Sequence, residues 1–388
     1  MMKNLTLKKV IAVTKISLFA TWCWPLPKNT VKLKVICVRL YQYLCLILTL
    51  SLTAGLMNTV KNHVDEPLIM AKSIIVMSPT VHVICNIICC KIYSRRLQLV
   101  TFEMENFSEL LKPREEEIVQ RYIDKCVYFY GGSILCIYLS AIVIITGPVT
   151  LDQPFPSNAE YPFVMYKQPL KSIIFVHQSF VFIQAAGQIC MNVFIALLLW
   201  TTSARFELLT IELRAVTDIH GLIKCIREHK KLLQYAKEVV TIARPFALST
   251  ISLSTFALII IGLILVTNQP LSIKIQCVGL TFSGLSEVFM YTWPAEHLMH
   301  ISGEIRQAVF DTQWYKQSIA LRKYLQIIML KAQNPIVIAI PCVMPALSLN
   351  YYASVRKEFE YCFDVHHAHQ SFGQIILHNS IRATSYFL

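Results

Sequence analysis

The sequence predicts an all-α polytopic membrane protein with seven transmembrane helices, a cytosolic N-terminus and an extracellular C-terminus. Apolar residues make up 55% of the 388 residues and charged residues only 15%, whereas soluble domains contain about 45–50% and about 25%. The apolar residues form stretches of about 20 residues, which is enough to cross about 30 Å of hydrocarbon as a helix. Basic residues are concentrated in alternate loops, which predicts the orientation.

The chain is expected to begin with a cytosolic N-terminal tail, residues 1–34. Its short apolar patch is interrupted by Lys15, whereas the apolar region of a signal peptide is continuous. A seven-helix transmembrane domain follows over residues 35–355. Apolar positions recurring at three and four predict that 205–244 continues as a cytosolic helix, and an amphipathic pattern up to Lys331 gives a second extension, 300–331. Residues 356–388 form a divergent C-terminal tail. The expected spans are 35–57, 68–92, 126–148, 173–200, 246–268, 272–294 and 336–355.

The orientation follows from the loops. Lys and Arg are concentrated in the N-terminal tail, in the loop 93–124 and in the segments 204–244 and 295–324, and they are scarce in the other loops. Because cytosolic loops carry an excess of Lys and Arg, these four regions are expected in the cytosol. An odd number of spans then places the C-terminus outside. This distribution also explains the net charge of +13.

Several function classes have no residues to support them. No zinc-finger, helix-turn-helix or RNA-binding pattern accompanies the positive charge, so nucleic acid is not an expected partner. No Ser-His-Asp arrangement, HExxH motif, phosphate-binding loop or dinucleotide fingerprint occurs, so an enzyme is not expected. The 13 cysteines lie mostly in apolar stretches and form no CxxC pair, which indicates packing rather than metal binding. Neither a cofactor nor a metal is expected.

Polar residues inside the spans are the candidates for function. His177, Gln184 and Gln188 share one face of the fourth span with Phe180, and Gln276, Ser283 and Glu287 have the same spacing in the sixth. A carboxylate in mid-span costs about 2.5–3.5 kcal/mol on insertion scales, so Glu287 is expected to face the bundle rather than lipid. Such residues either form hydrogen bonds between helices or line an apolar ligand cavity with a few polar groups, and the sequence leaves both interpretations open.

The last apolar stretch carries a motif. Met329–Pro335 and Pro345–Ser354, preceded by Gln313-Trp314-Tyr315, resemble the C-terminal signature of insect odorant receptors, and Trp22–Pro27 resembles the tryptophan-proline element before their first span. The resemblance implies a ligand-gated cation channel subunit that forms a hetero-tetramer with an odorant co-receptor in the plasma membrane of a sensory neuron dendrite. The ligand would be a small volatile molecule. The cytosolic helices would form the anchor between subunits.

In the family the odorant pocket lies in the outer half of the bundle and the last span lines the pore. Carried over to this chain, the resemblance implies that the odorant binds among the second, third, fourth and sixth spans and that the last span lines the pore at Ser348, Tyr352 and Val355. Helical phase within those four spans gives the ligand-binding candidates Ser73, Met77, Thr80, Tyr138, Ile142, His177, Phe180, Gln184 and Gln276. Aromatic and methionine side chains suit volatile apolar ligands, because dispersion and burial need little directional chemistry.

Three other classes are weighed against this interpretation. A gustatory receptor shares the topology, but its closing Thr-Tyr…Gln-Phe pattern is missing from this sequence. A G-protein-coupled receptor requires the opposite orientation and has Asp-Arg-Tyr or Asn-Pro-x-x-Tyr elements, which do not occur here. A transporter is expected to show internal repeats or paired broken helices, and none is found.

The sequence departs from the family after Val355, where charged residues replace an apolar ending. Arg356, Lys357, Glu358, Glu360 and Asp364 are too many charges for a membrane-embedded segment unless water reaches it. Two explanations are an unusual charged outer vestibule and a tail that arises from an altered last exon. We favour the second, although Tyr361-Cys-Phe363 lies near the position of the family's closing tyrosine motif.

Overall fold

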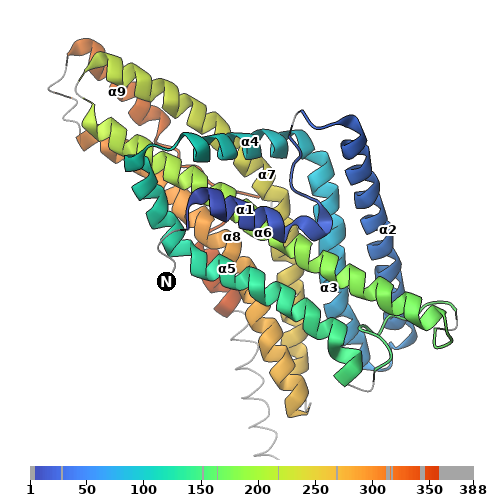
Figure 1. Cartoon of the computed structure of the whole chain (residues 1–388). Helices are drawn as coiled ribbons and strands as arrows, with labels where there is room; N and C mark the ends of the chain where they lie inside the picture. Colours follow the sequence, from blue (N-terminus) through green and yellow to red (C-terminus); the bar gives the residue numbers. More distant parts are fainter. Residues whose placement is uncertain are drawn as a thin grey trace, which may run out of the picture.

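A computed structural model of the chain describes residues 5–357 except 28, 151–152, 164, 217, 268–269, 312–314, 316–317 and 341–345. The described chain is helical, and long helices run side by side as a bundle (Figure 1). Its elements are α1 (Leu7–Ser17), the 3-10 turn η1 (Phe19–Thr21), α2 (Lys32–Asn62), α3 (Pro67–Ile92), α4 (Ser94–Leu110), α5 (Pro113–Thr150), α6 (Leu170–Ala215), α7 (Ile219–Val266), α8 (Leu271–Asp311) and α9 (Ile319–Lys331).

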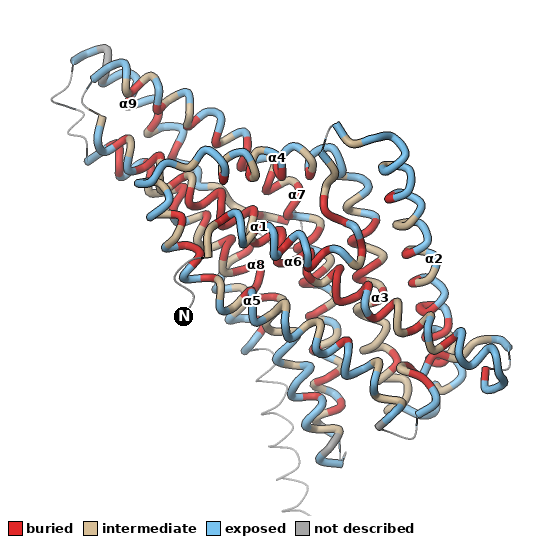
Figure 2. The backbone as a smooth tube through the Cα atoms, viewed as in Figure 1, coloured by how far each residue is buried: buried red, intermediate tan, exposed pale blue. Residues whose placement is uncertain are grey.

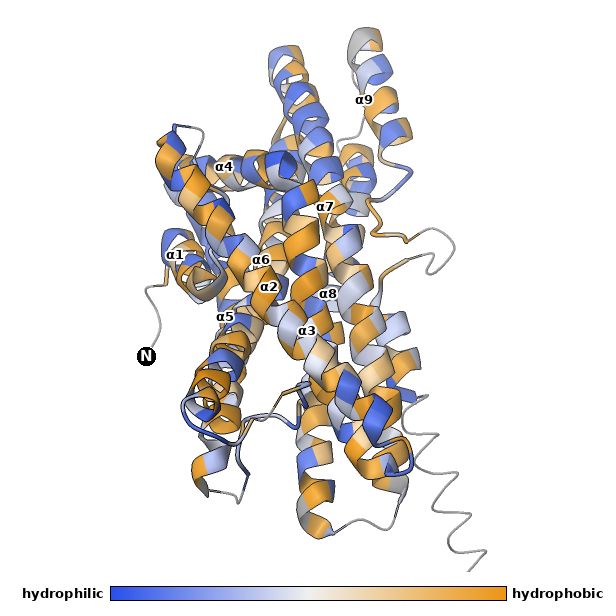
Figure 3. Cartoon of the chain, turned by 90° about the vertical axis from the view of Figure 1, so that its right-hand side faces the viewer, coloured by the Kyte–Doolittle hydropathy of each residue, from blue (hydrophilic) through white to orange (hydrophobic). Residues whose placement is uncertain are grey.

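The two ends of the bundle differ in their connections. The loop end is where α2 turns into α3 and α5 connects to α6, and the α4 end is where α4 lies across the other helices (Figure 1). Within the described residues, five helices are long and apolar enough to cross a membrane, namely α2, α3, α5, α6 and α7. Hydrophilic residues gather on the parts that project beyond α4, as Figure 3 shows.

Helix α6 is the centre of the bundle. Apolar side chains are found on every side of it, and a helix of that kind is buried among its neighbours. Its buried residues run almost without interruption from Val181 to Phe206, and Figure 2 shows this helix as the main column of buried backbone. Helices α2, α3, α5, α7 and α8 pack around it. Most other spans leave one apolar face exposed, as expected for helices in contact with lipid.

The helices extend further than the expected spans on the α4 side. Helix α6 continues to Ala215, and α7 begins at Ile219 after a break at which the Asp218 carboxylate accepts hydrogen bonds from the N–H groups of His220 and Gly221, both at 3.1 Å. The prediction that 205–244 is helical is therefore confirmed, apart from this break. These extensions, together with the end of α8 and with α9, form an arm beyond α4 (Figure 1).

One segment adds a helix to the expected elements, and another differs from expectation. The N-terminal tail contains α1, whose buried Leu7 and Ile11 pack onto the bundle while Lys8 and Lys9 stay exposed. The last expected span, 336–355, is not one continuous helix. Residues 336–340 are extended, with the Leu347 N–H donating to Ile338 O at 2.8 Å, and helix is found again only at 349–357. Prolines 335, 341 and 345 explain the break, since proline removes a helical donor and constrains the preceding residue.

Candidate ligand-binding site

Five of the nine residues expected to bind ligand face α2. Thr80 Oγ1 on α3 lies 3.0 Å from Thr53 Oγ1, and Gln184 Oε1 on α6 lies 3.4 Å from Thr49 Oγ1. The ring of Phe180 is perpendicular to that of Tyr41, with 6.5 Å between centroids. Met77 packs against the buried cluster of Leu52, Leu56, Ala159 and Val181. His177 lies in the same region, because its ring contacts Leu48 of α2. We call this region the α2–α3–α6 junction.

His177 is the most polar member of the junction. Its Nε2 lies 3.0 Å from the Leu48 carbonyl oxygen on α2, and its Nδ1 lies 3.4 Å from the hydroxyl of Tyr161 in the α5–α6 loop. One imidazole thus connects α6, α2 and the loop. The first of these interactions is of ordinary length and the second is at the limit for a hydrogen bond.

The loop 153–169 covers the junction at the loop end. Thr59 Oγ1 donates to Asn158 O at 2.7 Å and accepts from the Glu160 N–H at 3.0 Å, while Gln178 Oε1 accepts from the Ser157 N–H at 3.0 Å. The missing side chain of Gly55 allows the close approach, because a Cβ there would lie 3.2 Å from Ala159 Cβ. The loop is therefore attached to both α2 and α6.

An ionic cluster at the start of α3 holds the same loop. His63 Nε2 lies 2.8 Å from Glu160 Oε1 and its Nδ1 lies 3.2 Å from Glu66 Oε1, while Asn62 Nδ2 donates to Glu160 Oε2 at 2.8 Å. The pKa of His63 is raised, mainly by its hydrogen bond to Glu160 and to a smaller extent by its hydrogen bond to Glu66. The pKa of Glu160 is lowered, mainly by its hydrogen bond to Asn62 and to a smaller extent by its hydrogen bond to His63.

The other four expected residues make different contacts or are exposed. Tyr138 on α5 donates its hydroxyl to Ser17 O of α1, and Ser73 is buried with its hydroxyl bonded to Ile69 O at 2.9 Å. Ile142 is 54% exposed and Gln276 is exposed as well. Ser73 lies four residues before Met77 and seven before Thr80, so it shares their face of α3. The assignment of all four residues to ligand binding stays a prediction.

A buried polar cluster lies deeper along α6. Asn192 Oδ1 accepts from the hydroxyls of Thr250 on α7 at 3.2 Å and Tyr291 on α8 at 3.0 Å, and Thr250 Oγ1 also lies 3.0 Å from His82 Nε2 on α3. This cluster joins four helices. The expectation that Glu287 faces the bundle is also confirmed, because its Oε2 accepts a 2.6 Å hydrogen bond from Ser254 on α7.

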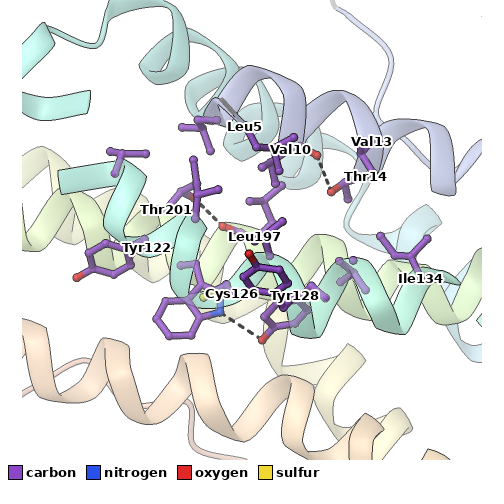
Figure 4. A pocket seen from close by; sticks show the side chains of 18 of the residues that line it. Leu5, Val10, Val13, Thr14, Tyr122, Cys126, Tyr128, Ile134, Leu197 and Thr201 are labelled. Atoms are coloured by element: carbon purple, nitrogen blue, oxygen red, sulfur yellow. Dashed lines mark hydrogen bonds between the residues drawn. The ribbon is translucent and has the colours of Figure 1, made fainter. Parts of the chain in front are cut away.

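A separate apolar cavity of about 490 Å³ lies between α1, α5 and α6 (Figure 4). None of the nine expected ligand residues lines it. Gly131 and Gly132 line the cavity, and a Cβ at either position would meet no atom within 4 Å. This pair of adjacent glycines within a span is the feature of the sequence that could have indicated the cavity. Its volume is within the range of about 300–1,000 Å³ for small-molecule sites. The side chains labelled in Figure 4 are Leu5, Val10, Val13, Thr14, Tyr122, Cys126, Tyr128, Ile134, Leu197 and Thr201.

Aromatic rings connect one wall of this cavity with the C-terminal helix 349–357. Tyr130 on the wall is stacked parallel to Trp293 of α8, with 6.3 Å between centroids. Trp293 stacks on Phe289 at 5.3 Å, and Phe289 meets Tyr352 edge-on at 5.3 Å. The hydroxyl of Tyr130 accepts a hydrogen bond from Trp200 Nε1 at 3.2 Å and donates one to Met290 O at 3.0 Å.

The three residues expected to line a pore are on or next to helix 349–357. Ser348 precedes this helix, and its carbonyl oxygen accepts the Tyr352 N–H at 3.2 Å. Tyr352 contacts Phe289, and Val355 is 7% exposed. Gln313, Trp314 and Pro345 of the motif, and the tail from residue 358, lie outside the described residues.

Residues 68–358 match the family model described as 7tm Odorant receptor. The chain belongs to this family. This odorant receptor family member is 25% identical over 118 residues to putative odorant receptor 85d of Drosophila melanogaster, covering 30% of this chain and 29% of that protein. It is 27% identical over 149 residues to odorant receptor Or2 of Anopheles gambiae, covering 36% and 39%. The matched stretches thus span well under half the length of these curated relatives.

Solved structures of insect olfactory receptors share the fold. The structure of olfactory receptor OR5 from Machilis hrabei in complex with eugenol gives a TM-score of 0.78 at 17% identity, covering 93% of this chain and 98% of that one. A structure of the same receptor described without eugenol gives 0.76 at 15% identity, covering 92% and 97%. The all-α receptor fold expected from the sequence is therefore confirmed.

Proposed function

We propose that this odorant receptor family member is a subunit of a ligand-gated cation channel that detects small volatile molecules. It works in a hetero-tetramer with an odorant co-receptor in the plasma membrane of sensory neuron dendrites. The observation that carries the proposal is the family match over residues 68–358, on a chain that has the fold of an insect olfactory receptor. Fold alone does not imply function, so the ligand region must be argued from its residues.

The ligand binds at the α2–α3–α6 junction beneath the loop 153–169. This region combines apolar side chains with a few polar groups, which is the composition of small-molecule sites. Met77 adapts its shape to a ligand because its side chain is unbranched and polarisable. A ligand that enters replaces the weak 3.4 Å interaction between Tyr161 and His177, and it gains the imidazole as a polar partner.

The pore is formed by helix 349–357 with Ser348, Tyr352 and Val355, and the arm beyond α4 is the anchor between subunits. The α4 end faces the cytosol, because the arm and the loop 93–124 carry most of the Lys and Arg of the loops. The ionic cluster of His63, Glu66 and Glu160 then lies at the outer surface. Accessibility of epitope tags in intact cells tests this orientation, and a C-terminal tag reached only after permeabilisation would contradict it.

Co-expression with an odorant co-receptor and recording of cation current against a panel of volatile molecules tests the function. An odorant-evoked current that the co-receptor alone does not give is the expected result. Matched His177→Ala and His177→Phe variants then locate the ligand, because the phenylalanine keeps the ring volume and removes both ring nitrogens. A well-expressed complex at the cell surface with no response to any volatile molecule would refute the proposal.

A further inference from the structure

The apolar cavity between α1, α5 and α6 opens on the outside of the bundle. Its rim includes Val13, Tyr128 and Leu135, which are 48%, 72% and 61% exposed. Apolar side chains this exposed on a span contact lipid rather than water. The cavity is also long, since its lining on α5 runs from Val119 to Leu135, which corresponds to about 24 Å along the helix. An elongated apolar space that opens toward hydrocarbon has the shape of an extended chain.

A polar pocket of about 290 Å³ adjoins one end of this cavity. The two share Leu7, Val119 and Ile123. The polar pocket is lined by Lys8 at the start of α1 and by the carboxylates of Glu109 and Glu116 at the α4–α5 connection. Helix α1 is amphipathic, with a buried apolar face and exposed lysines, and such helices lie in the interface between membrane and water. The polar pocket is therefore at the depth of lipid headgroups.

We propose that these two adjoining spaces bind one membrane phospholipid with a zwitterionic headgroup. One acyl chain occupies the apolar cavity. The phosphate lies near the Lys8 ammonium and the positive N-terminal end of α1, which favours an anion. The ammonium of the headgroup lies near Glu109 and Glu116. An anionic phospholipid whose headgroup carries no ammonium, such as phosphatidylglycerol, fits less well, because it has no cation to place beside these two carboxylates.

A photoactivatable phosphatidylcholine with a diazirine on its acyl chain tests the binding. The full chain is reconstituted in vesicles of unlabelled phosphatidylcholine that contain a small fraction of this probe, and the cross-linked peptides are mapped. We expect labels on α1, on the 119–135 stretch of α5 and on α6. Competition by phosphatidylcholine in detergent is expected to be stronger than competition by phosphatidylglycerol or by a free fatty acid.

Variants that fill the cavity give the decisive comparison. Gly131→Leu places a side chain in the open space, and Val13→Trp fills it from the α1 side. Each is expected to lower labelling in this region about tenfold or more, because several methylene groups lose their buried site. Gly279→Leu on α8 is the matched control, since its Cβ also meets no atom within 4 Å and lies away from the cavity. Monodisperse elution of every variant from a sizing column shows that it is folded.

A second variant pair tests the headgroup. Glu109→Gln combined with Glu116→Gln removes the two carboxylates, and we expect the preference for phosphatidylcholine over phosphatidylglycerol to be lost or reversed. The proposal is overturned if the label spreads along the lipid-facing surface equally in the wild type, Gly131→Leu and Val13→Trp, since that describes only the surrounding bilayer. Tighter competition by phosphatidylglycerol in the wild type would also overturn it. These readouts need no odorant and no current, so they do not depend on the proposed channel function.

Discussion

Replacing Asn192 by leucine tests whether the buried polar cluster stabilises the bundle. The Asn192 side-chain oxygen accepts hydrogen bonds from Thr250 and Tyr291 at 3.2 and 3.0 Å, and all three residues are fully buried. Thr250 keeps an alternative partner in His82 Nε2 at 3.0 Å, whereas the hydroxyl of Tyr291 loses this acceptor. An interhelical hydrogen bond between membrane helices contributes about 0.6 kcal/mol on average and at most about 1.7 kcal/mol, while a buried group without a partner costs about 1–3 kcal/mol. We therefore expect Asn192→Leu to cost about 1–2 kcal/mol.

The matching variant is Tyr291→Phe, which removes the hydroxyl and leaves Thr250 as a donor to Asn192. We expect this change to cost less than Asn192→Leu, because the phenylalanine leaves no hydroxyl without a partner. The double variant should cost less than the sum of the two single variants, with a coupling free energy of about 0.6–1.7 kcal/mol. Unfolding of the purified protein in mixed micelles, followed by tryptophan fluorescence, measures all four proteins of the cycle. Costs that simply add, within about 0.3 kcal/mol, would show that this hydrogen bond makes no contribution.

Three further predictions concern the ligand, the loop and the arm. His177→Ala and Phe180→Ala should each shift odorant potency or ranking without changing surface expression, and unchanged dose–response curves for both would remove the junction as the ligand site. Because the pKa of His63 is raised in the folded state, its attraction to Glu160 stabilises the fold fully below about pH 6.5. This contribution is lost as the pH rises through the higher native pKa of His63. The pKa of Glu160 is lowered, so its side of the interaction is lost only in acid. The difference in thermal stability between wild type and His63→Gln should therefore be larger at about pH 6 than at about pH 9, and an equal difference at both would contradict the assignment. Deleting 205–244 should abolish the complex with the co-receptor, so co-purification of an intact hetero-oligomer would refute the role of the arm.

The helices were predictable from the sequence where a periodic pattern reflects burial against one neighbour. Recurrence at three and four identified 205–244 as helix, and the charge of Glu287 indicated that this position faces other helices. The continuous span expected over 336–355 was wrong at 336–340, because an apolar composition suits a span whether or not the segment is helical. Sequence patterns thus predict a regular helix well and a break inside an apolar span poorly.

The ligand site was less predictable, because helical phase gives the face of a residue and not its neighbour. Gln184 was expected to face inward, and it does, but the pattern could not show that it meets Thr49 of α2. Tyr138 was assigned to ligand binding from its helical face, and that face could not show that its hydroxyl reaches Ser17 of α1, in the N-terminal tail. The apolar cavity was not predictable for the same reason, since it is enclosed by α1, α5 and α6, and no pattern within one helix shows that these three are neighbours.

The stacked rings between Tyr130 and Tyr352 have a consequence for motion. Flat rings in contact resist compression, because closely packed side chains transmit strain rather than absorb it. We therefore expect a small rotation of α5 beside Tyr130 to displace Trp293 and Phe289, and with them Tyr352 and helix 349–357. Trp293 and Phe289 of α8 thus link the cavity wall on α5 to helix 349–357, although neither ring belongs to α5 or to that helix.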